Sequence, residues 1–141
     1  MASIRYQIGC DDVDWQVLHD TLIADDFHNG RTVAQYQQSF ENSHTVIIAY
    51  DGDKLVGTVR ALSDGVCNAY LVDVWTLTTY RRQGIARAMM TQTLQQLRGQ
   101  HVYLWTDDQH TFYEAIGMQR DENASGYFIV VGDWLDNDSA S

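Results

Sequence analysis

The most informative stretch of this chain is Tyr80-Arg81-Arg82-Gln83-Gly84-Ile85-Ala86-Arg87-Ala88-Met89-Met90. It follows a β-like run over residues 69–77 and opens a helix-like run that reaches Leu97. A glycine-containing turn between a strand and a helix presents several backbone N–H groups in one direction, at the positive end of the helix dipole. Because phosphate groups are the usual guests of such turns, the stretch predicts an anion site.

The charge pattern around this turn supports the same interpretation. The chain is acidic, with 19 Asp and Glu against 9 Lys and Arg, yet no acid occurs between Asp73 and Asp107. Random placement would put about four acids there. Arg81, Arg82 and Arg87 add positive charge, and Gly84 allows a close backbone approach that a Cβ would block. A helix start that lacks acids by chance is the alternative; the flanking strand and helix favour the anion site.

Hydrophobic periodicity predicts an α/β (α+β) arrangement, a single sheet with helices on its faces. The predicted strands cover residues 4–9, 45–50, 55–62, 68–77, 101–105 and 127–131, with a hairpin at 51–53. The predicted helices run from a cap at Asp11 or Asp12 through Ile23, over 32–40, from Gly84 to Leu97, and over 111–116. We expect residues 1–135 to form one domain and 136–141 to be a disordered acidic tail.

Composition narrows the class of protein. We expect a cytoplasmic protein without a membrane partner, because no apolar run approaches a bilayer's thickness and no signal-peptide core is present. A sequence pI near 4.6 argues against a nucleic-acid partner, which would favour a basic face. Cys10 and Cys67 match no metal or redox spacing, so we expect no metal site.

Two segments resemble one family. Arg81-Arg82-Gln83-Gly84-Ile85-Ala86 fits the R/Q-x-x-G-x-G/A signature of the GCN5-related N-acetyltransferases, the GNAT family. The stretch from Thr106 to Met118, which contains Phe112-Tyr113, is similar to the family's later F-Y-x-x-x-G-F segment. Ala86, Thr78 and Met118 depart from the commoner residues, but no departure removes a group that the reaction needs. The resemblance implies a mixed, mostly antiparallel sheet of six to seven strands with helices on both faces.

The resemblance also implies an enzyme of the acyltransferase type (EC 2.3.1) with acetyl-CoA as co-substrate. In the family, the turn holds the pyrophosphate, which here implicates Arg81, Arg82, Gln83, Gly84, Ile85 and Ala86. The preceding strand binds the pantetheine arm through free backbone groups, which implicates Val74, Trp75 and Thr76. Because no cysteine lies in these segments, we expect direct transfer rather than a covalent acetyl-enzyme.

The proton transfers need an acid and a base. Tyr113 matches the family tyrosine beside the CoA sulfur, and a phenol is protonated at neutral pH, so it can donate to a departing thiolate. Its alternative role is an aromatic core contact. Asp73 is the candidate base, although it could instead orient a neighbouring backbone group or bind the amine, and ordered water could replace it. His28, His44 and His110 have suitable intrinsic pKa values but are more often structural.

The acceptor is expected near Asp25, Asp26, Phe27 and His28, between the first two helices. Carboxylates beside an aromatic ring suit a small cationic amine or an arylalkylamine, whereas a solvated acidic loop is the alternative. The expected activity is N-acetylation of a small-molecule primary amine by a monomer or homodimer. A non-catalytic acyl-CoA sensor, a protein or peptide N-acetyltransferase and a generic phosphate-binding module are the other hypotheses.

Overall fold

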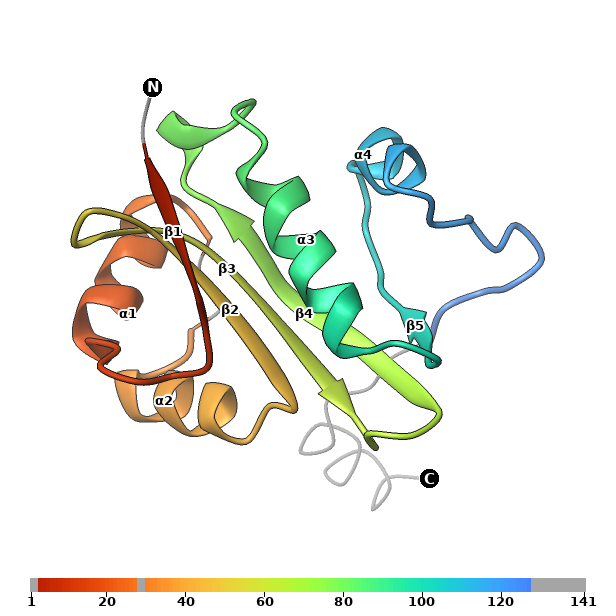
Figure 1. The fold of residues 1–141 in the computed structure, drawn as a ribbon, viewed down its shortest axis with the longest axis horizontal. Coiled ribbons are helices and arrows are strands. Elements are labelled where there is room, and N and C mark those ends of the chain that lie inside the picture. The colour runs from red at the N-terminus through yellow and green to blue at the C-terminus, as the bar shows by residue number, and fades with distance from the viewer. Residues whose placement is uncertain (1–2, 28–29, 128–141) are drawn as a thin grey trace, which may run out of the picture. The chain divides into compact units, whose positions relative to one another are not determined.

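A single β-sheet forms the centre of the first part of the chain. The computed structural model describes residues 3–27 and 30–127, and the chain divides into two compact units, Met1–Trp105 and Thr106–Ser141. The first unit holds a five-stranded sheet whose spatial order follows the sequence (Figure 1). The strands are β1 (Ile4–Ile8), β2 (Thr45–Asp51), β3 (Lys54–Ser63), β4 (Asn68–Thr76) and β5 (His101–Tyr103). Only the β4–β5 pair is parallel, so the sheet is mixed and mostly antiparallel, as predicted.

Helices cover both faces of this sheet, as predicted (Figure 1). On one face lie α1 (Trp15–Ala24) and α2 (Val33–Glu41), and on the other lies α3 (Ile85–Gln96). Large apolar side chains of α1 and α2 form one buried cluster with residues of the sheet: Leu18, Leu22, Tyr36, Phe40, Val46, Ile48, Leu55 and Trp75. Ile85, Met89 and Met90 of α3 are buried as well. Alternate residues of the central strands therefore face α1 and α2 on one side of the sheet and α3 on the other.

The helix starts follow from side-chain caps. Thr32 and Gln35 form a complete capping box at α2, which confirms the predicted start near residue 32. The predicted cap of α1 at Asp11 or Asp12 is wrong. Asp14 caps α1 instead, because its carboxylate accepts a hydrogen bond from Val17 N at 3.1 Å, and Asp12, with a φ of 58°, lies outside the helix.

The prediction of six to seven strands is wrong for the described residues, which form five. Downstream of β5, the described part of the second unit contains one short helix, α4 (His110–Ala115), followed by turns. The strand predicted over residues 127–131 lies outside the described residues except for Tyr127. No helix in the described ranges is long and apolar enough to cross a membrane.

The sheet contacts α3 closely at Gly57. A Cβ at this position would lie 2.8 Å from Met89 Cε and 3.2 Å from the carbonyl oxygen of Trp75. We therefore expect Gly57→Ala to lower the free energy of unfolding by about 1–3 kcal/mol in urea denaturation, because the core would be overpacked. In a Met89→Ala background, where the thioether is gone, the same substitution should cost much less. An equal cost in both backgrounds would contradict this account of the contact.

Candidate functional site

The predicted anion turn joins the end of β4 to the start of α3 through a short 3-10 helix, η1 (Thr78–Tyr80). Gly84 is the N-cap of α3 with a φ of 82°, and no side chain caps the helix. The N–H groups of Ile85, Ala86 and Arg87 have no intrahelical partner, as in the first turn of any helix. The side chains of Arg81, Arg82 and Gln83 are exposed. This geometry leaves backbone donors and positive charge available to an anion.

The space around Gly84 is open. A Cβ added at Gly84 would meet no atom within 4 Å, so packing inside the protein does not demand glycine there. The left-handed backbone and the approach of a ligand remain as reasons for it. The first turn of α3 contains no acidic residue. Arg81 Nε donates to the carbonyl oxygen of Thr76 at 3.4 Å, which ties the turn to the end of β4.

The end of β4 has an open edge beside this turn. β4 pairs with β5 only over Asn68–Tyr70, and among the described residues no strand pairs with 71–76 on that side. Leu77 N donates to Val56 O at 2.8 Å, so strand alternation directs the peptide groups of Val74 and Thr76 away from β3. Peptide groups on an open edge can bind an extended ligand as an added strand.

Thr76 offers a second sign of a missing partner at this edge. Its hydroxyl is the one buried side-chain polar atom in the described part of the chain that has no hydrogen-bond partner. Buried polar atoms are nearly always paired, so such an exception often marks a functional position. The Thr76 hydroxyl lies on the strand segment for which backbone binding was predicted.

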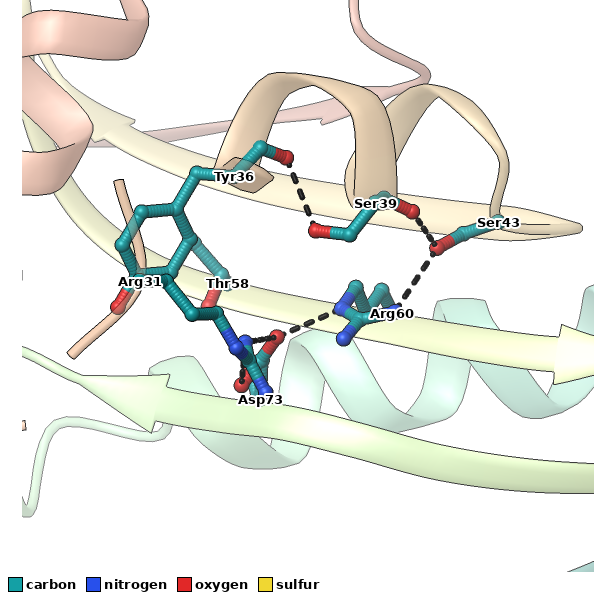
Figure 2. Close-up of polar contacts among 7 residues, drawn as sticks. All are labelled: Arg31, Tyr36, Ser39, Ser43, Thr58, Arg60 and Asp73. Atoms are coloured by element: carbon teal, nitrogen blue, oxygen red, sulfur yellow. Dashed lines mark hydrogen bonds and ion pairs between the residues drawn. The ribbon is translucent and has the colours of Figure 1, made fainter. Parts of the chain in front are cut away.

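Asp73, the predicted base, lies in a buried ion-pair network (Figure 2). Its side chain is 7% exposed. One carboxylate oxygen accepts from Arg60 Nε at 2.6 Å, and Arg31 Nη1 contacts both oxygens at 2.9 and 3.2 Å. Thr58 Oγ1 donates to the Asp73 carbonyl at 2.8 Å. Both carboxylate oxygens therefore already accept hydrogen bonds from guanidinium groups.

The predicted acceptor segment is joined to β4. Asp25 Oδ2 accepts hydrogen bonds from Trp75 Nε1 at 2.9 Å and from Thr78 N at 3.0 Å. The structure thus brings together two candidate regions that lie far apart in the sequence. Asp26 and Phe27 are exposed, Phe27 by 37%, and His28 lies outside the described residues. The Asp25 carboxylate is consequently a structural link as well as a candidate for substrate contact.

Tyr113 lies on α4 in the second unit, and its ring packs edge-on against Phe112 with centroids 5.0 Å apart. Burial raises the pKa of Tyr113 above its ordinary value, and the nearby Asp108 carboxylate raises it further. The hydroxyl therefore stays protonated across the neutral range, as a general acid requires.

Two of the histidines considered as bases, His44 and His110, lie at the starts of secondary-structure elements. His44 Nδ1 lies 2.8 Å from Thr45 Oγ1 at the start of β2, and His110 begins α4. Within residues 3–27 and 30–127, no three His, Cys, Asp or Glu side chains gather as a possible metal site.

Arg31, Thr58 and Arg60 are not among the residues predicted from the sequence. Arg60 carried a usable signal, since it stands inside the apolar run of β3, and a charge in a buried strand requires a partner. Asp73 in the neighbouring strand is the matching charge. Arg31 gave no such signal, because it lies in a polar segment before α2.

Comparison with known proteins agrees with this geometry. Residues 12–118 match the model of the acetyltransferase (GNAT) family. A GNAT family acetyltransferase of Streptococcus pneumoniae shares 25% identity with a TM-score of 0.74, covering 92% of this chain and 98% of that one.

Two further solved structures share the fold. A probable acetyltransferase from meticillin-resistant Staphylococcus aureus has 20% identity and a TM-score of 0.75, over 89% of this chain and 98% of its own. A predicted acetyltransferase of Clostridium acetobutylicum, solved with acetyl-CoA, has 16% identity and a TM-score of 0.64, over 89% and 96%.

The link between Asp25 and β4 can be tested by unfolding. We expect Asp25→Ala to lower the free energy of unfolding by about 1–3 kcal/mol, because the buried indole N–H of Trp75 would lose its acceptor. Asp26→Asn is the control, since it changes a neighbouring exposed carboxylate and keeps a residue type that tolerates the φ of 59° there. It should stay within about 0.5 kcal/mol of the parent in denaturant unfolding. Equal losses in both variants would show that the Asp25 hydrogen bonds do not matter.

Proposed function

The chain belongs to the acetyltransferase (GNAT) family, and we propose that it moves an acetyl group from acetyl-CoA to a primary amine of a small molecule by direct transfer. The observation that carries the proposal is the open edge of β4, followed after η1 by a start of α3 that has no side-chain cap and no acidic residue. One part supplies peptide groups for an extended arm, and the other supplies N–H groups for phosphates.

In this proposal the donor is held mainly by backbone groups. The turn from Arg81 to Ala86 binds the pyrophosphate, with the exposed arginines adding charge. The peptide groups of Val74 and Thr76, on either side of Trp75, bind the pantetheine arm. A backbone N–H at this edge also polarises the thioester carbonyl, which gains negative charge as the amine attacks. Acetyl-CoA supplies the activated acyl group.

The proton balance assigns two further roles. The attacking amine loses a proton, and the departing thiolate gains one. We assign the second step to Tyr113, whose raised pKa keeps the proton available. For the first step Asp73 was the predicted acceptor, but its carboxylate oxygens are engaged by Arg31 and Arg60. Water is therefore favoured over Asp73 as the immediate proton acceptor.

The acceptor is assigned to the segment between α1 and α2. Asp25 fixes this segment to β4, which leaves the exposed Asp26 and Phe27, together with His28, to meet the amine. A carboxylate and an aromatic ring suit a small cationic amine or an arylalkylamine. Free thiol release from acetyl-CoA, measured with polyamines, arylalkylamines, amino acids and peptide N-termini, tests this assignment. Binding of acetyl-CoA without turnover of any amine would favour a sensor instead.

Donor binding should depend on Gly84. Acetyl-CoA should raise the thermal midpoint of the parent protein, since a ligand at a hundredfold its Kd adds about 2.7 kcal/mol to stability. Gly84→Asp should abolish this shift by placing negative charge beside the phosphates. Gly84→Asn has nearly the same shape and tolerates the left-handed backbone, so it should keep part of the shift. An unchanged midpoint of the parent with millimolar acetyl-CoA would reject the proposal.

The acid can be tested with Tyr113→Phe, which removes only the hydroxyl. If this hydroxyl protonates the thiolate, kcat should fall at least tenfold, because general acid catalysis is typically worth about 10²–10⁴-fold. Affinity for acetyl-CoA and the thermal midpoint should stay near the parent's. A lowered midpoint with normal kcat would instead assign Tyr113 to packing.

A further inference from the structure

An extra residue in β4 determines which groups face the site. Val72 stands opposite Arg60 and Trp75 opposite Thr58, so β4 advances three residues where β3 advances two. In a regular ladder Trp75 would stand opposite Gly57, whose missing side chain faces Met89 of α3. A one-residue slip reverses the face and the edge that every later residue presents. The bulge therefore directs the Trp75 indole toward Asp25 and the peptide groups of Val74 and Thr76 toward the open edge.

The bulge residue, Asp73, is fixed at both its backbone and its side chain. Its φ of 52° lies in the left-handed region, which L residues adopt uncommonly and aspartate more readily than most. Thr58 holds its carbonyl group, and Arg60 holds its carboxylate, at 2.8 and 2.6 Å. Both partners come from β3 and flank the position opposite the bulge.

Arg60 is itself held in place (Figure 2). Its side chain is 8% exposed, and its guanidinium carbon lies 5.5 Å from the centre of the Phe40 ring. Arg60 Nη1 donates to Ser43 Oγ at 3.3 Å, and that hydroxyl donates to Ser39 O at 2.8 Å. Arg60 thus connects α2, through Phe40 and Ser43, to the bulge residue Asp73 in β4.

The same strand end holds the segment between α1 and α2 at two points. Asp25 contacts Trp75, and Arg31, which is 31% exposed, contacts Asp73. The segment contributes an anionic side chain, Asp25, at one contact and a cationic side chain, Arg31, at the other. Their partners, Trp75 and Asp73, are two residues apart in β4. Both ends of the segment assigned to the acceptor are therefore attached to the strand assigned to the donor.

We infer that Arg31, Thr58, Arg60 and Asp73 form a positioning unit, the β4 clamp, which aligns the open edge of β4 with the acceptor segment. Asp73 then acts through the backbone it fixes and is not the proton acceptor. The catalytic consequence rests on the proposed function. The effect of the clamp on the β4 backbone does not depend on it.

Kinetics separate a positioning unit from a base. We expect Asp73→Asn and Arg60→Met each to lower kcat about 10- to 100-fold, because small misplacements of reacting groups have effects of that size. The kcat of the double variant should be little lower than that of the more impaired single variant, because both substitutions disrupt the same unit. The pH profile of kcat/KM should keep its shape in Asp73→Asn. Arg5→Met is the matched control, because Arg5 packs over the Tyr50 ring from β1 and should leave kcat unchanged.

A base at Asp73 predicts the opposite pattern. The acidic limb of the kcat/KM profile would disappear in Asp73→Asn, and Arg60→Met would keep the parent's kcat or exceed it. Either result overturns the inference. Arg31→Met, at the more exposed end of the clamp, serves if Arg60→Met does not fold.

A readout without turnover keeps the clamp testable if no amine is acetylated. Amide hydrogen exchange, followed by NMR, should become faster at Trp75 and Leu77 in Arg60→Met and Arg31→Met, because these N–H groups face β3 and Leu77 N donates to Val56 O. The Trp75 indole N–H resonance should also shift. Neither change should occur in Arg5→Met. Parent-like exchange in both clamp variants would overturn the inference, whereas failure of every amine with normal clamp behaviour would reject only the proposed function.

Discussion

The buried carboxylate of Asp73 between two guanidinium groups is the constraint on which the other features depend. A charge removed from water costs several kcal/mol unless it is paired and hydrogen-bonded. Removing one member of a buried ion pair is strongly destabilising, because the other charge stays buried without a partner. The Asp73 carboxylate meets both Arg31 and Arg60 only when β4, β3 and the segment before α2 are positioned as they are in this structure. That arrangement includes the left-handed bulge in β4, so an electrostatic requirement in the interior sets the direction of peptide groups at the strand edge.

Two separate devices meet at the end of β4. β4 pairs with β5 only as far as Tyr70, so among the described residues 71–76 have no strand partner on that side, and the chain then turns through Gly84 into α3. Both devices use the backbone, and the side chains around them serve chiefly to hold it. Trp75, a large buried residue, is accordingly anchored by its indole N–H to Asp25, while the peptide groups of its neighbours face the open edge.

Local patterns predicted much of the fold. Alternating apolar residues placed β2, β3 and β4 within a residue or two, and the glycine turn placed the start of α3. The cap of α1 failed because three aspartates compete within residues 11–14 and only the tertiary path of the chain selects Asp14. Periodicity predicted six strands and the family resemblance six to seven, whereas the described residues form five, because the sixth predicted strand, at 127–131, lies outside them except for Tyr127.

The sequence was enough to indicate the family and to place the glycine turn before α3, because six contiguous residues, Arg81 to Ala86, carry the turn's glycine and its charge. The contacts of Asp73 and Asp25 are visible only in the tertiary structure. Their partners Arg31 and Trp75 lie 42 and 50 positions away. Such pairs depend on strand register, and one bulge residue reverses every contact beyond it, which no local periodicity encodes.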